Sequence, residues 1–290
     1  MMAGTQSQFL DVGSGTERRS IAYLREPGAA AGKPGLVWLC GLKSEMTGTK
    51  AAAVAERARS QGLACVRFDY SGHGQSGGTF EAGTISRWLE EAEAVFRSLT
   101  QGPQILVGSS MGGYIALLLL RRLLGNVGLR VVSKTRLRRG ALTQPTATEE
   151  AARIAGLVLI APAWDMTDLM WRNLPSSARR DIEEKGVHLR PSHYGDGPYP
   201  ITRAFIEDGK RHLVGSAPFD PGRPVYILHG LQDPDVPWEH TLDLVAHLSG
   251  DWTRVAAVPD GEHRLSRPED IALLLGIIAE LIQGKPPQRP

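Results

Sequence analysis

The sequence predicts an α/β fold with a mostly parallel, doubly wound sheet of about eight strands. Short apolar runs recur along the chain, and most of those after residue 35 are continuously apolar rather than alternating. Such runs are typical of strands buried on both faces of a parallel sheet. Amphipathic helical patterns separate them, and alternation of strand with helix favours a sheet covered by helices on both faces.

The elements follow in order from these patterns. The expected strands are the apolar runs at residues 19–26, 35–40, 63–69, 104–109, 155–162, 223–230 and 253–259. The helical patterns lie at residues 48–61, 84–99, 111–124, 238–249 and 268–283. Residues 84–99 carry one apolar stripe at i, i+3, i+4 spacing. Ser266 and Glu269 have the spacing of a capping box, which predicts the start of the last helix.

Two segments interrupt the alternation within one predicted core domain, residues 1–161 and 223–290. Residues 125–153 are polar and basic, and we expect a surface insertion there. Its arginines suit either a solvated loop or an anionic partner. Residues 162–222 hold aromatic clusters, prolines and short helical pieces, and we expect them to form a small helical lid inserted after the sixth strand.

Composition excludes several classes of function. With 33 basic and 31 acidic residues the net charge is only +2, so nucleic acid is not expected as a partner. Two cysteines, Cys40 and Cys65, are too few for a cysteine zinc site and favour a reducing compartment. No apolar run has the length of a signal peptide or a membrane span, so we expect a cytoplasmic protein with no transmembrane segment. No phosphate loop or dinucleotide fingerprint is present, and we expect no cofactor.

The stretch "QILVGSSMGGYIALLLL", residues 104–120, predicts a nucleophile. Gly108 and Gly112 flank Ser110 in a G-x-S-x-G pattern, whereas Ser109 has no such flanks. A serine held on a tight strand-to-helix corner needs small neighbours, because bulky ones would collide across the turn. A plain glycine-rich corner is the alternative. The helix that follows supplies free N–H groups suited to a developing oxyanion.

A serine hydroxyl needs a base to take its proton and an acid to orient that base. Where the serine lies on a G-x-S-x-G turn between strand and helix, the three residues follow along the chain in the order serine, acid, histidine. Asp233 follows the strand at 223–230, and His263 lies in the loop before the last helix. Asp235 is the competing acid, further from the strand end. We interpret His229 as a buried residue that holds the Asp233 turn. Asp69 follows another strand, and we expect it to satisfy N–H groups of its glycine-rich loop.

The remaining machinery is predicted from the backbone. The loop after residue 40 should present the N–H of Leu42 to the serine, and Met111 should supply the second oxyanion donor. None of the histidines has metal-ligand spacing with a carboxylate partner, so we expect no metal. A dehalogenase is excluded because it would need a carboxylate at position 110.

Together these motifs resemble those of the α/β-hydrolase superfamily of serine hydrolases. A closer resemblance, to the abhydrolase-domain acyl-protein (palmitoyl) thioesterases and acyl-glucuronide esterases, rests on "TGTKA" (47–51), "CVRFDYSG" (65–72), "GPQILVGSSMGG" (102–113), "RPSHY" (190–194) and "LHGLQDPDVPW" (228–238). The resemblance implies that Ser110, Asp233 and His263 form the family's catalytic triad. It also implies hydrolysis of fatty-acyl thioesters on proteins and of acyl-glucuronide esters.

We therefore expect an enzyme that cleaves ester or thioester bonds of small-molecule or acylated-protein substrates through an acyl-enzyme. An apolar acyl pocket is predicted from lid residues, with core packing as the alternative: Trp164, Met166, Met170, Trp171, Leu174 and Tyr194. A generic carboxylesterase, a carbon–carbon bond hydrolase, or a ligand-binding protein on a hydrolase scaffold remain alternatives. The sequence does not give the oligomeric state.

Overall fold

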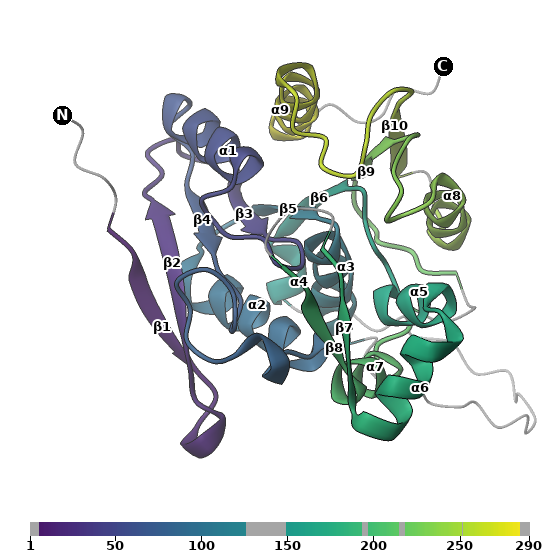
Figure 1. Ribbon diagram of the computed structural model, residues 1–290. Coiled ribbons are helices and arrows are strands. Elements are labelled where there is room, and N and C mark those ends of the chain that lie inside the picture. Colours follow the sequence, from purple (N-terminus) through teal and green to yellow (C-terminus); the bar gives the residue numbers. More distant parts are fainter. Residues whose placement is uncertain (1–5, 126–148, 193–196, 215–217, 251, 285–290) are drawn as a thin grey trace, which may run out of the picture.

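The computed structural model of the protein describes residues 6–125, 149–192, 197–214, 218–250 and 252–284. At its centre is an eight-stranded sheet in the order β1-β2-β4-β3-β5-β6-β9-β10 (Figure 1). Strand β2 pairs antiparallel with both β1 and β4, and all the other strand pairs of this sheet are parallel. The predicted sheet is thereby confirmed. Its strands are β1 (Gln8–Val12), β2 (Arg19–Glu26), β3 (Gly35–Leu39), β4 (Cys65–Phe68), β5 (Gln104–Ser109), β6 (Ile154–Ile160), β9 (Val225–Gly230) and β10 (Thr253–Val258).

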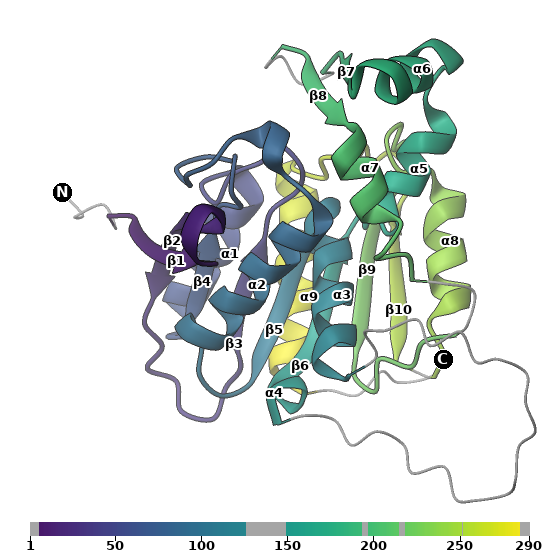
Figure 2. The ribbon, with the colours of Figure 1, turned by 90° about the horizontal axis from the view of Figure 1, so that it is seen from below.

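Helices cover both faces of this sheet. Helices α1 and α9 pack together on one face, and α2 and α3 pack together on the other (Figure 2). The expected helices appear within one or two residues of the expected bounds. The helical elements are η1 (Gly15–Glu17), α1 (Thr49–Ser60), η2 (Phe80–Ala82), α2 (Ile85–Leu99), α3 (Met111–Leu123), α4 (Glu149–Ala152), α5 (Met166–Asn173), α6 (Ser176–Lys185), α7 (Arg203–Gly209), α8 (Trp238–His247) and α9 (Pro268–Ile282).

The core lies between the sheet and these helices. Strands β3, β4 and β5 are buried along their whole length, as their continuously apolar sequences predict. From α2, Trp88 and Phe96 enter this core fully buried. Helix α3 is buried on almost every side, so it lies in the interior directly behind β5. The sheet and α3 therefore form the rigid base on which the loops at the strand ends are held.

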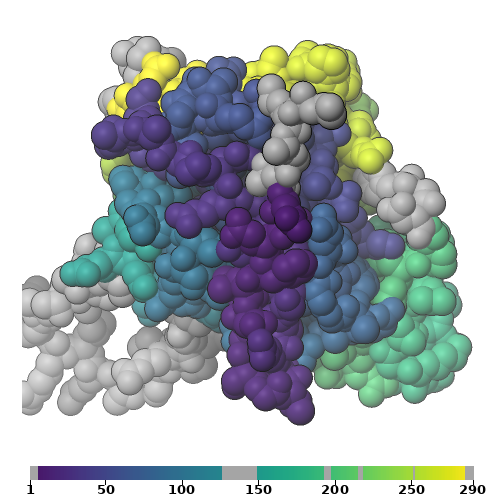
Figure 3. Space-filling model, turned by 90° about the vertical axis from the view of Figure 1, so that its left-hand side faces the viewer, coloured from purple at the N-terminus to yellow at the C-terminus, as the bar shows by residue number. Residues whose placement is uncertain are grey.

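Two local predictions were wrong or incomplete. Strand β1 was not predicted; it forms the outer edge of the sheet, where the side chain of Phe9 is 58% exposed (Figure 3). Because most of β1 is exposed, its sequence contains no continuous run of apolar residues that would indicate a strand. The last helix begins at Pro268, as expected, but its N-cap residue is Arg267 rather than Ser266, and the Asp270 carboxylate accepts the backbone N–H of Arg267 at 3.1 Å. The capping interaction is thus shifted by one residue from the predicted pair.

Between β6 and β9 the chain forms α5, α6, a two-stranded sheet of β7 (Val187–Arg190) and β8 (Tyr199–Thr202), and α7. These elements lie over the carboxyl ends of the parallel strands (Figure 2), after the sixth strand of the sheet as predicted. The boundaries 162–222 remain a prediction. So does the surface insertion at 125–153, because its residues 126–148 lie outside the described part of the chain.

Helix α7 is tied to the core by polar contacts. The Asp208 carboxylate accepts both the backbone N–H and the hydroxyl of Ser86, each at 2.7 Å, at the beginning of α2. The Tyr114 hydroxyl of α3 donates to the carbonyl of His212 at 2.7 Å. Because α3 begins directly after Ser110, these contacts connect the segment over the strand ends to the helix that follows the predicted nucleophile.

Candidate active site

Ser110 lies on the corner between β5 and α3, with φ +53° and ψ −116°. Positive φ is rare for a residue with a side chain and costs roughly 1–3 kcal/mol, so the surrounding structure must enforce it. A Cβ atom on Gly108 would lie 2.3 Å from the Gly112 carbonyl oxygen, and one on Gly112 would lie 2.0 Å from that of Leu39. Only glycines fit on either side of the corner, for the steric reason that the sequence suggested.

Three side chains that are far apart in sequence meet at this corner. His263 Nε2 lies 3.1 Å from Ser110 Oγ, and His263 Nδ1 lies 2.7 Å from Asp233 Oδ2. The Asp233 side chain is fully buried, and the His263 side chain is 14% exposed. The three predicted residues thus form one continuous hydrogen-bonded chain from hydroxyl to imidazole to carboxylate.

The Asp233 carboxylate is fixed by its own turn. Its Oδ1 accepts the N–H groups of Asp235 and Val236 at 2.8 and 2.9 Å, which leaves Oδ2 facing the imidazole. Asp235, the competing acid, lies 3.8 Å from the guanidinium of Arg190. The acid next to the imidazole is therefore Asp233, the residue nearer the strand end.

His229 supports the turn that carries Asp233, as predicted. Its fully buried ring makes contacts from Nε2 to the Val236 carbonyl at 3.1 Å and from Nδ1 to the Thr241 hydroxyl at 2.9 Å. Burial lowers the pKa of His229, which favours the neutral ring with the proton on Nε2. This neutral histidine is a support of the turn and lies 4.0 Å from the Asp233 carboxylate.

The loop after β3 passes directly beside the serine. A Cβ atom on Gly41 would lie 3.4 Å from the Cβ of Ser110. The carbonyl of Gly41 accepts the N–H of Ser44 at 3.1 Å, so the chain turns at Leu42 and Lys43. Neither the Leu42 nor the Met111 N–H donates to an acceptor within the described residues. Both amides are therefore free to donate, as the predicted role of oxyanion donors requires, and that role remains a prediction.

Asp69 supports this loop from below. Its two carboxylate oxygens accept the N–H of Met46 at 2.6 Å and the N–H of Gln75 at 2.9 Å. Burial raises the pKa of Asp69, and the two N–H groups oppose that rise. The predicted structural role of Asp69 is confirmed, and it extends to the loop after β3 as well as its own glycine-rich loop.

Lys50, in α1, holds the loop that carries His263. Its Nζ donates to the carbonyl of Arg264, the residue after the histidine, and lies 3.3 Å from the Ser266 hydroxyl. Burial lowers the pKa of Lys50 to about 8. Leu265 in this loop is fully buried at φ +42°, a strained conformation. Sequence reasoning missed this role of Lys50, although the residue lies in the motif "TGTKA".

Comparisons with known proteins agree with this geometry. The family described as "Alpha/beta hydrolase family" matches residues 27–272. The chain belongs to the alpha/beta hydrolase family. It is similar to the human mitochondrial palmitoyl-protein thioesterase ABHD10, at 31% identity over 91% of this chain and 76% of that protein. The predicted resemblance and the assignment as a hydrolase are therefore confirmed.

Solved structures give the same result. A putative hydrolase from Agrobacterium vitis S4 is 44% identical, with a TM-score of 0.84 over 96% of this chain and 98% of that one. Mouse alpha/beta hydrolase domain-containing protein 10 is 31% identical, with a TM-score of 0.77 over 96% and 99%. Est1E from Butyrivibrio proteoclasticus, recorded with ferulic acid, has a TM-score of 0.66 over 92% and 95% at 18% identity, which shows the fold alone.

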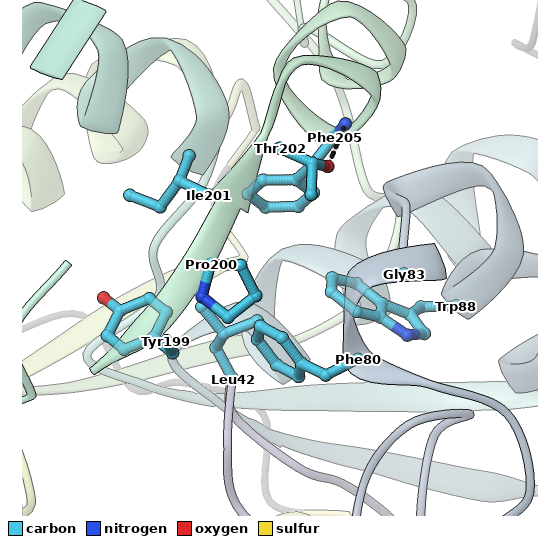
Figure 4. A pocket seen from close by; sticks show the side chains of 9 residues that line it. All are labelled: Leu42, Phe80, Gly83, Trp88, Tyr199, Pro200, Ile201, Thr202 and Phe205. Carbon is cyan, nitrogen blue, oxygen red and sulfur yellow. Dashed lines mark hydrogen bonds between the residues drawn. The ribbon is translucent and has the colours of Figure 1, made fainter. Parts of the chain in front are cut away.

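In this hydrolase an apolar pocket begins at Leu42 (Figure 4). It lies between η2, α2, β8 and α7 and is lined by Leu42, Phe80, Gly83, Trp88, Tyr199, Pro200, Ile201, Thr202 and Phe205. Its volume is about 10 Å³, close to the room that one water molecule needs. The sequence analysis did not find this pocket, because its walls come from three separate parts of the chain, namely Leu42, residues 80–88 and residues 199–205.

The lid residues expected to line an acyl pocket do not line this one. Trp164 donates its indole N–H to the His240 carbonyl at 2.8 Å and stacks on the His240 ring. Met166 and Leu174 are buried, and Met170 and Trp171 pack against the core. These contacts support the alternative that the residues close the core. Tyr194 lies outside the described residues.

A second group of serine, histidine and aspartate lies beside α7, but it does not form a hydrogen-bonded chain like that of Ser110, His263 and Asp233. Ser86 Oγ lies 2.7 Å from both His212 Nε2 and Asp208 Oδ1. Asp208 approaches His212 at the same Nε2 atom, at 3.8 Å, instead of orienting the opposite ring nitrogen. The carboxylate therefore binds the serine itself, and the group ties α7 to α2.

Two carboxylates and an imidazole at the site lie close enough together to be candidate ligands of a metal ion. Asp233, Asp235 and His263 have candidate ligand atoms within 4.8 Å of one another. Asp233 and His263 already bind each other, and Asp235 faces Arg190. The contacts account for these groups without an ion, and the absence of a metal remains a prediction. Within the described residues, no helix is both long and apolar enough to cross a bilayer.

Proposed function

We propose that this protein is a serine esterase or thioesterase that cleaves acyl substrates through an acyl-enzyme on Ser110. The observation that carries the proposal is the continuous contact of Asp233, His263 and Ser110, with 2.7 and 3.1 Å between the facing atoms. A hydroxyl is a weak nucleophile until a base removes its proton, and an oriented imidazole is suited to do so. The strained corner at Ser110 presents that hydroxyl to the substrate.

In the first step His263 takes the proton of Ser110 as the oxygen attacks the carbonyl carbon. The N–H groups of Leu42 and Met111 stabilise the oxyanion, each contributing roughly 2–4 kcal/mol at the transition state. Asp233 holds the imidazole in the productive tautomer. His263 then protonates the leaving alkoxide or thiolate, and a water molecule repeats the sequence on the acyl-enzyme to release the acid.

For the bond that is cleaved, the names of the relatives support a thioester. The human and mouse relatives are named palmitoyl-protein thioesterases and share 31% and 32% of their aligned residues with this chain. A palmitoyl-protein substrate is accordingly our proposal at the finer level, and an acyl-glucuronide ester is proposed from the resemblance of the motifs. A generic carboxylesterase is the second candidate, because the pocket at Leu42, with about 10 Å³, has no room for a long acyl chain as it stands.

The test is labelling and turnover of the purified full chain. A fluorophosphonate probe should label wild type at Ser110, and the label should be absent from Ser110→Ala. Matched oxygen esters, thioesters and an acyl glucuronide, each with short and long acyl chains, then separate the candidates. Wild-type protein that neither reacts with the probe nor hydrolyses any ester would point to a ligand-binding protein. Turnover restricted to vinylogous diketones would point to a carbon–carbon bond hydrolase.

A further inference from the structure

Lys43 lies next to the proposed oxyanion donor and is held in a strained conformation. It directly follows Leu42 in the turn closed by the hydrogen bond from Ser44 to Gly41, and its φ is +56°. A residue with a side chain is disfavoured there, and glycine would adopt the turn without strain. The position nevertheless carries a lysine, which suggests that the side chain has a use.

The ammonium group of Lys43 lies beside two aromatic rings of the apolar pocket. Its Nζ lies 6.0 Å from the ring centre of Phe80 and 5.9 Å from that of Tyr199. Both rings line the pocket together with Leu42 (Figure 4). A cation over two ring faces gains roughly 0.5–1 kcal/mol at an exposed site. The contacts are sufficient to bias the side chain toward these rings while leaving its donors free.

Within the described residues, the charge of Lys43 is not neutralised by an ion pair, because no carboxylate there lies within ion-pair distance of its Nζ. The other cation near Tyr199, Arg190, faces Asp235 at 3.8 Å. The charge of Arg190 opposes the rise in the pKa of Tyr199 that burial causes. Lys43 therefore places a positive charge beside rings that line an apolar pocket.

We infer that Lys43 binds an anionic group on the leaving part of the substrate, so that the enzyme prefers acyl esters or thioesters whose alcohol or thiol carries a carboxylate or phosphate. The inference rests on the proposed function. Lys43 directly follows the proposed oxyanion donor Leu42, and its exposed ammonium is placed to meet a charged group of the substrate. A fatty-acyl chain carries no charge, so such a group belongs to the part that leaves. An anion there exchanges water for an ammonium that has no carboxylate partner among the described residues.

Two esters of the same shape test this inference: the butyrate esters of 3-hydroxybenzoate and of 3-hydroxybenzamide, which differ in charge. Wild type should cleave the anionic ester with the higher kcat/KM. Lys43→Met, which keeps the aliphatic contact with the rings, should lower kcat/KM about tenfold on the anionic ester, mainly through KM. It should leave the neutral ester within about twofold of wild type, and Lys43→Arg should retain the preference. Added salt should weaken the preference in wild type alone.

Equal losses on both esters in Lys43→Met would overturn the inference, since they would indicate a role in shaping the turn. Equal kcat/KM on the two esters in wild type would overturn it as well. If wild type cleaves neither ester, the substrate panel and probe labelling above still decide the proposed function, and binding decides the inference separately. Calorimetry should then detect binding of 3-hydroxybenzoate, but not of 3-hydroxybenzamide, to Ser110→Ala. That binding should be lost in the double variant with Lys43→Met, and its persistence there would contradict the inference.

Discussion

The Nε2 atom of His263 lies 3.1 Å from Oγ of Ser110, although 153 residues separate them along the chain. The topology of the sheet explains the convergence. Ser110 follows β5 and His263 follows β10, and parallel strands bring their carboxyl ends to one edge. Strands β6 and β9 lie between β5 and β10, so the loop that carries His263 extends over their ends toward β5.

Replacing Ser110 by alanine tests the nucleophile. Ser110→Ala should lower kcat on a nitrophenyl ester by about 10⁴-fold or more, because the remaining groups cannot form an acyl-enzyme. Ser109→Ala is the matched control. It removes a hydroxyl from the adjacent residue, which is buried at the end of β5, and it should retain most of the activity. Similar losses in both variants, or normal turnover by Ser110→Ala, would contradict the assignment.

Replacing each of two neighbouring aspartates tests the orienting acid. Asp233→Asn should lower kcat about 10⁴-fold, because an amide no longer favours the tautomer with a proton on Nδ1 of His263. Asp235→Asn removes the charge of a carboxylate that faces Arg190 in a partly exposed contact, and we expect a change of less than about tenfold. Melting temperatures of both variants show whether the turn remains folded. The reverse order of effects would make Asp235 the acid.

The sequence was sufficient to predict the sheet except β1, and the three residues that meet at its edge. Each of the three follows a strand that the sequence predicts, so pattern and spacing indicate both the strand and the loop after it. The pocket was beyond such reasoning. Phe80 and Phe205 come from separate short elements and line one pocket because α7 docks on the beginning of α2. The lid residues Trp164 and Trp171, in contrast, belong to a conspicuous pattern and pack against α8 and the core.

Replacing Lys50 tests whether it positions His263. Lys50→Met removes the hydrogen bond to the Arg264 carbonyl and should lower kcat about 10- to 100-fold with little change in KM, because small displacements of a catalytic group are costly. Lys50→Arg should recover part of the loss. Reaction with a fluorophosphonate probe should slow in parallel, since it also depends on His263. Unchanged probe kinetics in Lys50→Met would show that the lysine supports the loop without aligning the imidazole.

Widening the pocket tests its role in acyl recognition. With about 10 Å³ of free volume, the pocket does not accommodate an acyl chain until a wall moves. Phe80→Ala removes a ring from the wall, so the ratio of kcat/KM for an octanoate ester to that for an acetate ester should increase about tenfold or more. Phe9→Ala, at the exposed edge strand, is the control for loss of a phenyl ring. An unchanged ratio in Phe80→Ala would place the acyl chain elsewhere.

A final prediction concerns the effect of pH on the free energy of unfolding through Asp165, in the segment that lies over the strand ends. Asp165 accepts the N–H of Val214 at 2.9 Å, and burial raises its pKa from 3.8 to about 6. The folded state therefore binds more protons than the unfolded state between these values. The contribution of Asp165 to the free energy of unfolding is greatest below about pH 3.8 and is lost as the pH rises through about 6.

Asp165→Asn removes this titration, and asparagine tolerates the left-handed backbone at φ +49°. Relative to this variant, wild type should lose roughly 1–3 kcal/mol of unfolding free energy between pH 4 and pH 7. Urea titrations at four pH values measure the difference. Asp168→Asn, which removes an exposed carboxylate from the same helix, is the control. If the free energy of unfolding of each variant differs from that of wild type by an amount that does not change with pH, the buried carboxyl of Asp165 does not cause the pH dependence. Burial should cause one, because it penalises the charged form of a carboxyl, and an exposed carboxyl does not incur that cost.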